Sequence, residues 1–268
     1  MSDPIKLYWW NNTPNFGDTI GKDIVEYVSA RPDTWANARD ADLFSVGSLM
    51  VFVRRAHSTP RDGAKPYIWG CGSIGPHRMD FKENVEFCAV RGPLTETLLE
   101  MDGLPYGDPG LLISRVVEKA PSTGKFGIVL HHSQQLTPEQ NDKLSSDNRF
   151  VFIDVAAADH LSVVKQISEC DLVFSSSLHG LIVADSYSIP NIWLSPNSIH
   201  NTPKFKFYDY ANAIGRVLGR PKTIADIIPI ADAFEPFECP YANAIEDVCK
   251  GLIDAFPDNL RGKPKCRP

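Results

Sequence analysis

The sequence lacks the features that mark membrane-spanning, secreted and nucleic-acid-binding proteins. No run approaches the roughly 18 consecutive apolar residues needed to cross a bilayer, so we expect no transmembrane segment. The start, MSDPIKLYWWNN, has no basic stretch followed by an apolar run and a small-residue cleavage site, so we expect no secretory signal. The net charge of -6 gives no general attraction to nucleic acid, and any anion-binding site must therefore be local.

Cysteine is present, but not in the patterns that bind zinc or cross-link small secreted domains. The six cysteines are scattered, with no Cys-x-x-Cys pair and no Cys/His cluster at zinc-binding spacing. They are Cys71, Cys88, Cys170, Cys239, Cys249 and Cys266. We expect reduced thiols, most of them packed as small apolar side chains, in a cytoplasmic protein with no metal site and no cofactor.

What is present is an alternation of short apolar runs with helix-like segments, which is typical of parallel α/β folds. The polar, turn-rich stretch EKAPSTGK interrupts this rhythm, which then restarts. We therefore expect two Rossmann-like domains, residues 1–118 and 119–230, whose parallel sheets face a central cleft where such folds bind ligands. Apolar residues at helical spacing in the segment 231–268 predict an amphipathic helix that packs back on the body.

The stretch NFGDTIGKDIV follows the first predicted strand, where doubly wound domains contact phosphates or sugars. Gly17 allows the backbone to approach a ligand closely, and the carboxyl group of Asp18 is suited to accept a proton from a substrate hydroxyl. The alternative is that Asp18 only caps the helix that begins here.

The stretch WGCGSIG has glycines at the spacing of a dinucleotide-binding fingerprint, but no helix is expected after it. We interpret it as a loop lined by backbone, in which Gly72 and Ser73 contribute to substrate binding.

Two strand-to-helix transitions place charged or titratable side chains beside free helix N–H groups. In VRGPLT, Arg91 and Gly92 end a strand and open a helix, a natural position for binding a carboxylate or phosphate. The alternative for Arg91 is a salt bridge between the domains. In SSSLHG, His179 lies near the start of the second helix, where the helix dipole disfavours the protonated imidazole unless an anion compensates.

The residues directly before His179 complete this second transition. Ser176 and Ser177 form the turn, Leu178 begins the helix, and we expect all three to bind substrate beside His179. The alternative for His179 is a neutral core histidine packed against backbone.

The stretch KFKFYDYANAIG supplies two further cations. The alternation of Lys204 and Lys206 predicts that both face one side and offer charge to an anion. The alternative is a solvated surface, where most lysines lie.

Taken in order along the chain, these stretches resemble the polysaccharide pyruvyl transferase family. The motifs are NFGD, RGPLT, GDPGLL, SSLHG followed by PNIWL, and DY followed by AIG, and they cover roughly residues 5 to 220. Each motif is weak alone, and their order and spacing carry the resemblance. The short length resembles the branch that acts in exopolysaccharide synthesis, including the succinoglycan ketolase type.

The resemblance implies a GT-B-like fold and transfer of a pyruvyl group from phosphoenolpyruvate to a sugar, as a cyclic ketal on two hydroxyls. Arg91 would bind the donor anion, and His179 would act as general acid or bind the donor. Asp18 would face the acceptor, held by the first domain, and take the proton of the attacking hydroxyl. The implied partners are phosphoenolpyruvate and a sugar or lipid-linked oligosaccharide, with any membrane association peripheral and through the acceptor.

One position departs from the family pattern. Many members carry arginine directly before Leu-His, and here that position is Ser177. Lys204, Lys206, Arg54 and Arg55 are candidates to replace this charge, and the sequence does not choose among them.

Two other functions stay open at this point. A GT-B glycosyltransferase that uses a nucleotide sugar would share the fold, and fold alone does not decide function. It would also need a base-stacking pocket and a ribose-binding carboxylate, which the sequence does not indicate. A non-catalytic sugar-binding module with a degenerate site is the second alternative, and the serine at position 177 is the reason to consider it.

Overall fold

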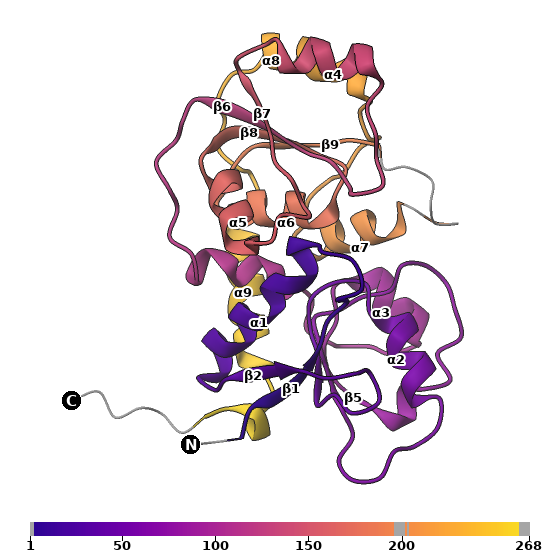
Figure 1. Ribbon diagram of the computed structural model, residues 1–268. Coiled ribbons are helices and arrows are strands. Elements are labelled where there is room, and N and C mark those ends of the chain that lie inside the picture. The colour runs from indigo at the N-terminus through magenta and orange to yellow at the C-terminus, as the bar shows by residue number, and fades with distance from the viewer. Residues whose placement is uncertain (1–2, 196–201, 203, 263–268) are drawn as a thin grey trace, which may run out of the picture.

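The computed structural model describes residues 3–195, 202 and 204–262, which form two parallel β-sheets with helices packed on them (Figure 1). The first sheet has five strands in the order β2-β1-β3-β4-β5. Its strands are β1 (Ile5–Tyr8), β2 (Asp33–Trp35), β3 (Leu43–Phe44), β4 (Tyr67–Trp69) and β5 (Glu86–Ala89). The connecting helices are α1 (Phe16–Ser29), α2 (Met50–His57) and α3 (Pro93–Leu99), with the 3₁₀ helix η1 at Lys82–Asn84.

The second sheet has four strands in the order β7-β6-β8-β9. Its strands are β6 (Lys125–Val129), β7 (Phe150–Phe152), β8 (Cys170–Ser175) and β9 (Asn191–Trp193). The helices that accompany it are α4 (Pro138–Ser145), α5 (His160–Ser168), α6 (Leu178–Ser186), α7 (Phe205–Ala213), η3 (Ile224–Asp226) and α8 (Ile227–Asp232). Every strand pairing in both sheets is parallel, which confirms the predicted α/β class.

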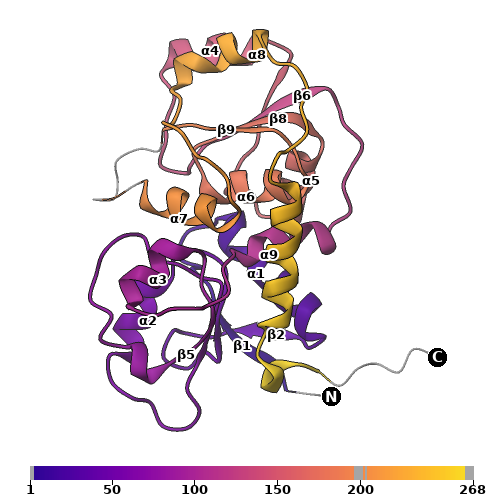
Figure 2. The ribbon, with the colours of Figure 1, turned by 180° about the vertical axis from the view of Figure 1, so that it is seen from behind.

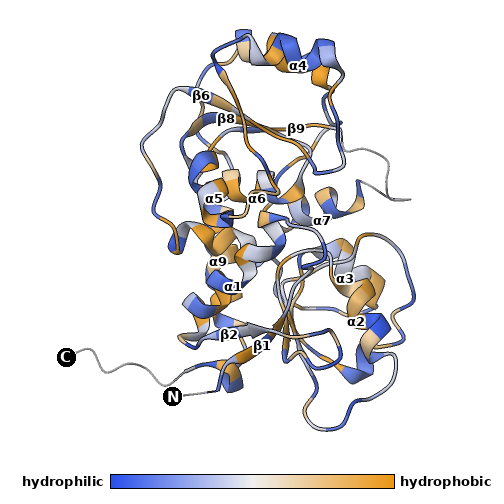
Figure 3. Ribbon diagram, in the orientation of Figure 1, coloured by the Kyte–Doolittle hydropathy of each residue, from blue (hydrophilic) through white to orange (hydrophobic). Residues whose placement is uncertain are grey.

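The units meet through packed helices and share one hydrophobic core. The 3₁₀ helix η2 (Pro109–Arg115) lies between α1 and α6, and α1 also packs on α5. At Gly110 a Cβ atom would lie only 2.9 Å from Ile182 Cγ2, so the absence of a side chain allows η2 to approach α6 this closely. Figure 3 shows hydrophobic residues concentrated on the strands and on inward helix faces. Buried apolar residues of both units form one continuous cluster.

The last helix crosses from one unit to the other. Figure 2 shows α9 (Ala242–Asp254), followed by η4 (Asp258–Leu260), running from the second sheet down beside the first. The indole of Trp69 donates a 2.8 Å hydrogen bond to the Leu252 carbonyl, and Gly262 N–H donates to the Ser29 carbonyl at 2.7 Å. The division of the chain at residue 118 stays a prediction, and residues 263–268 of the C-terminal segment lie outside the described residues.

Some elements differ from the sequence expectation. Helix α2 was not expected, because no capping side chain precedes it and its first turn contains no acidic residue. Five cysteines are free thiols, while Cys266 falls outside the described part of the chain. None of the helices among the described residues has the length and hydrophobicity needed to cross a bilayer.

A fully buried ion pair joins the two units. The Arg91 guanidinium, just after β5, donates to Asp209 Oδ2 on α7 at 3.0 Å, and neither side chain is exposed. Asp209 also accepts hydrogen bonds from Thr95 N at 2.9 Å and from Thr95 Oγ1 at 2.6 Å. It thereby caps α3, whose own N-cap residue, Gly92, has no side chain to do so. A Cβ atom at Gly92 would lie 2.0 Å from the Asp209 carbonyl oxygen.

We predict that Asp209→Asn destabilises the protein strongly, because it removes the carboxylate that pairs directly with the buried Arg91 guanidinium. Breaking a buried pair in this way costs about 3 to 5 kcal/mol, which urea unfolding would measure. The control is Asp80→Asn, which removes the partner of Arg54 from a surface pair with side chains 33% and 44% exposed. This variant should leave the free energy of unfolding nearly unchanged. Equal losses for the two variants would contradict the prediction.

Candidate active site

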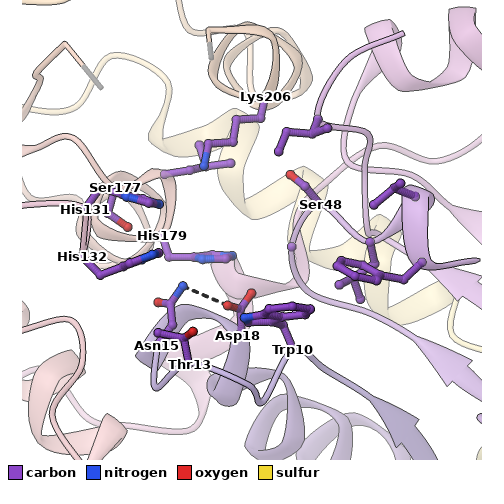
Figure 4. A pocket seen from close by; sticks show the side chains of 16 residues that line it. Trp10, Thr13, Asn15, Asp18, Ser48, His131, His132, Ser177, His179 and Lys206 are labelled. Atoms are coloured by element: carbon purple, nitrogen blue, oxygen red, sulfur yellow. Dashed lines mark hydrogen bonds between the residues drawn. The ribbon is translucent and has the colours of Figure 1, made fainter. Parts of the chain in front are cut away.

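A cavity of about 460 Å³ lies where the two units meet (Figure 4). Its lining comes from loops and helix starts that follow the carboxyl ends of strands, where open α/β sheets place ligands. The lining residues are Trp10, Thr13, Asn15, Asp18, Gly47, Ser48, Leu49, Val51, Phe52, Ile74, His131, His132, Ser177, Leu178, His179 and Lys206. The cavity therefore joins the loops after β1 and β3 to the starts of α6 and α7.

Asp18 lies in the first turn of α1 and faces the cavity. The helix is capped by Asn15, whose Oδ1 accepts from Gly17 N at 3.2 Å and whose Nδ2 donates to Asp18 Oδ2 at 2.8 Å. The alternative that Asp18 itself caps the helix is thus wrong. Burial raises the pKa of Asp18 to about 7, while nearby Lys206 and the Asn15 hydrogen bond oppose this rise. A carboxyl group of this kind exchanges its proton near neutral pH.

His179 is buried in the first turn of α6, directly against α1. A Cβ atom at Gly17 would lie 2.0 Å from His179 Nδ1, so only glycine lets the helix start pack this closely on the imidazole. Among the described residues, His179 Nε2 finds no hydrogen-bond partner. Burial, then Lys206 and Arg91, lower the pKa of His179 to about 3, and the imidazole is therefore neutral in the ligand-free site.

The loop at Gly47 brings Asp18 and His179 together. Gly47 has φ +100°, a left-handed conformation that favours glycine. A Cβ atom there would lie 3.2 Å from Asp18 Oδ1 and 3.8 Å from His179 Cε1. Figure 4 shows His179 lying between Asp18 and Lys206.

The two lysines expected to act together are separated by the structure. Lys206 lines the cavity, whereas Lys204 is exposed and lies outside the lining. The expectation that both face one side is wrong because the segment forms helix α7 rather than a strand. Positions two apart on a helix differ by about 200° in direction. Burial and the Arg91 charge lower the pKa of Lys206 to about 8, while Asp18 acts in the opposite direction.

Arg91 lies behind the cavity rather than in its lining. Its guanidinium donates to Ser48 Oγ at 2.7 Å and to the Ser73 carbonyl, in addition to the pair with Asp209. A Cβ atom at Gly72 would lie 2.5 Å from Arg91 Cζ, so Gly72 makes room for the guanidinium. The structure therefore shows the salt bridge between units that was the alternative for Arg91, and connects it to the cavity through Ser48.

The serines before His179 differ in position. Ser176 Oγ accepts a 2.9 Å hydrogen bond from His131 N, which connects the loop after β6 to the start of α6. Ser177 is the N-cap residue of α6 and lines the cavity together with Leu178. The four other residues expected to bind substrate lie outside the lining and pack against His179, Arg91 or Asp209; they are Gly17, Gly72, Ser73 and Gly92.

Sequence reasoning missed the aromatic wall of the cavity. Trp10, two residues after β1, and Phe52, in α2, have ring centroids 5.1 Å apart and line one wall of the cavity, and Figure 4 shows Trp10 beside Asp18. Trp10 lies in the same loop after the first strand as NFGD. That position is the sequence signal by which it could have been predicted. Within residues 3–195, 202 and 204–262, no group of three or more His, Cys, Asp or Glu side chains is placed to hold a metal ion.

Comparison with known proteins adds the family. The model of a family described as polysaccharide pyruvyl transferase matches residues 4–198. The chain belongs to this family. It is 32% identical to the succinoglycan biosynthesis protein ExoV of Rhizobium meliloti, over 81% of the chain and 66% of that protein. It is 30% identical to an uncharacterised protein of Acanthamoeba polyphaga mimivirus, over 47% of each.

The alignments with these two relatives thus span less than two thirds of each relative's own length. One solved structure, of a functionally uncharacterised Klebsiella pneumoniae protein, is similar with a TM-score of 0.47 and 12% identity. That similarity covers 78% of this chain and 87% of the other.

In this member of the polysaccharide pyruvyl transferase family, four cations were candidates to replace the arginine that many members carry at the position of Ser177. Arg54 forms a surface pair with Asp80, and Arg55 lies over the Phe52 ring with its Cζ 5.8 Å from the centroid. Lys204 is exposed. Among the described residues, Lys206 is the only cation in the cavity lining, and it is therefore the candidate that the geometry favours.

We predict that Asp18→Asn stabilises the protein relative to wild type at pH 8 but not at pH 4. The folded pKa of about 7 lies above the ordinary 3.8, so the folded chain retains a proton that the unfolded chain releases. The stability contributed by this proton is complete below pH 4 and is lost as the pH rises through 7.

Asparagine cannot ionise, and urea unfolding should show a gain of roughly 1 to 3 kcal/mol at pH 8 and little change at pH 4. The gain is limited because Lys206 loses a negatively charged neighbour. A loss of stability at pH 8 would contradict the prediction, because it would mean that Lys206 compensates fully for burial of the carboxylate.

Proposed function

We propose that this chain transfers the pyruvyl group of phosphoenolpyruvate to a sugar, as a cyclic ketal on two hydroxyls, in exopolysaccharide or cell-surface glycan biosynthesis. Family membership supports the reaction class. The observation that carries the proposal is the cavity that Asp18, His179 and Lys206 line together with the aromatic rings of Trp10 and Phe52. A cytoplasmic location stays a prediction.

In this proposal the donor binds at the start of α6 and α7. Phosphoenolpyruvate carries a phosphate and a carboxylate, and its site needs a cation together with free N–H donors. Lys206 supplies the cation, and the first-turn N–H groups of α6, which begins after Ser177, supply the donors. Arg91 acts indirectly, by holding Ser48 and by adding positive potential behind the cavity.

The acceptor sugar lies on the side of the first sheet. The rings of Trp10 and Phe52 offer a flat apolar surface to the C–H face of a sugar. Asp18 and Asn15 lie beside this surface and can bind hydroxyls. With the donor held by the second unit and the acceptor by the first, the arrangement is GT-B-like.

The proposed chemistry has two steps. His179 donates a proton to the methylene carbon of phosphoenolpyruvate, and a sugar hydroxyl attacks the adjacent carbon while its proton passes to Asp18. The second hydroxyl then bonds to the same carbon, the bond to phosphate breaks, and phosphate leaves with the electron pair and the remaining proton. A pKa near 7 suits Asp18 as a base.

His179 can act as the acid only after the donor has bound. Its pKa of about 3 reflects burial beside two cations, so it carries no proton in the empty site at neutral pH. Negative charge from a bound phosphate favours the imidazolium and raises this pKa. Donor binding therefore prepares the acid for proton transfer.

We predict that incubation with phosphoenolpyruvate and a panel of hexose acceptors releases phosphate and yields an acceptor whose mass rises by one pyruvyl ketal. His179→Ala should lose this turnover while its circular dichroism spectrum stays that of wild type. Parallel incubation with nucleotide sugars should release no nucleoside diphosphate. Release of nucleoside diphosphate without phosphate from phosphoenolpyruvate would overturn the proposed function in favour of glycosyl transfer.

We predict that Lys206→Ala weakens phosphoenolpyruvate binding by roughly 10- to 100-fold, the range expected for a hydrogen bond to a charged group. Titration calorimetry would measure the dissociation constant, with thermal stabilisation by phosphoenolpyruvate as a second readout. Lys204→Ala is the matched control, because it removes the same charge from the same end of α7 outside the cavity. An equal loss in both variants would show that general surface charge, rather than the cavity, attracts the donor.

A further inference from the structure

A second hollow lies beside the cavity and shares part of its wall. This groove has a volume of about 270 Å³ at the carboxyl ends of β6 and β7. His131 and His132, which follow β6, line both the cavity and the groove. Their rings contact each other in a tilted arrangement, with centroids 4.1 Å apart and planes inclined by 36°. A ligand that extends from the cavity across this histidine pair reaches the groove.

The groove presents an aromatic side chain to solvent. Phe152 ends the edge strand β7 and is 38% exposed, although most of the large apolar side chains in the chain are buried. It pairs in register with Ile128 of β6, which places it at the end of the sheet where the chain turns toward the histidines. Its ring therefore forms an exposed part of the groove wall.

Two side chains of the groove, Asp154 and Gln134, offer hydrogen-bond acceptors. Asp154 is exposed, and its Oδ1 accepts a 2.9 Å hydrogen bond from Ala156 N within its own turn. Gln134 Oε1 is buried and has no donor among the described residues, and such an unsatisfied acceptor in a groove is suited to a ligand hydroxyl. No described lysine or arginine lines the groove. This chemistry fits a neutral polyhydroxylated ligand rather than a phosphate or a nucleotide.

We infer that the groove binds a second sugar residue of the acceptor glycan, so that the acceptor extends from the first unit, where its reacting sugar binds, across the histidine pair onto the second unit. The inference rests on the proposed function, which supplies the reacting sugar. The second sugar packs its apolar face on Phe152, and its hydroxyls donate to Asp154 and Gln134. We therefore expect an oligosaccharide acceptor to bind more tightly than a free monosaccharide.

The test compares acceptors of increasing length. A p-nitrophenyl hexoside that is pyruvylated is assayed beside the corresponding di- and trisaccharide glycosides. In wild type the longer acceptors should have a KM roughly three- to tenfold lower, the gain expected from one aromatic contact. Phe152→Ala should remove this advantage and leave the KM for phosphoenolpyruvate and the monosaccharide kinetics unchanged. Asp154→Ala is a second variant that leaves the apolar core untouched and should reduce the advantage. Tyr27→Ala, which removes a 49% exposed aromatic ring on α1, is the matched control.

Two results would overturn the inference. One is a wild-type KM that does not depend on acceptor length. The other is a length advantage that survives in both groove variants. If Phe152→Ala instead changes the mass in solution from a dimer to a monomer, the groove is a contact between copies of the chain and the inference is again wrong.

Failure of the proposed function can be recognised separately. If no acceptor yields phosphate from phosphoenolpyruvate, the groove is tested by titrating the same trisaccharide glycoside into wild type and Phe152→Ala and measuring heat. Saturable binding that the variant loses supports the groove as a sugar site although the pyruvyl proposal has failed. Absence of binding to wild type overturns the groove as well.

Discussion

The buried ion pair between Arg91 and Asp209 is the interaction on which the geometry of the cavity depends. Arg91 lies just after β5 of the first sheet, and Asp209 lies in α7 beside the second sheet. The pair therefore fixes how the two units meet. Asp209 also caps α3, and Arg91 also holds Ser48 at the cavity wall. Because both charges are away from water, neither can be left without the other at small cost. The glycines at 72 and 92 leave the space that this pairing requires.

The same guanidinium shapes the electrostatics of the site. Its charge adds to burial in lowering the pKa of His179 and of Lys206. Asp108, buried beside it, keeps a raised pKa of about 6, and its Oδ2 has no partner among the described residues. The ligand-free cavity thus combines a neutral histidine, a carboxyl group that titrates near pH 7 and a lysine of reduced basicity. A negative charge placed in the cavity would act against these shifts and raise the pKa of both His179 and Lys206.

Much of the fold followed from local patterns, and part of it did not. Alternating apolar runs and helical periodicity predicted both parallel sheets. The stretch VRGPLT, which has proline at the first helical position, predicted the start of α3. Helix α2 was not predicted because it has neither a capping side chain nor an acidic first turn. Its packing on the first sheet stabilises it instead. From Lys204, lysine and phenylalanine repeat at every second position, which predicts that the two lysines face the same side. The segment nevertheless folds as helix α7.

By itself, the sequence determined the α/β class, the family and the small group of residues around which the site is built. Asp18 and His179 could be named because each follows a strand and opens a helix, a relation that is local in the chain. The tertiary structure alone decided which cation enters the cavity, that Arg91 supports it from behind, and that Trp10 and Phe52 form its aromatic wall. These outcomes depend on contacts between residues far apart in the sequence, such as Arg91 with Asp209 and Trp10 with Phe52. Side-chain direction and burial at such contacts are set by packing, which one-dimensional periodicity does not contain.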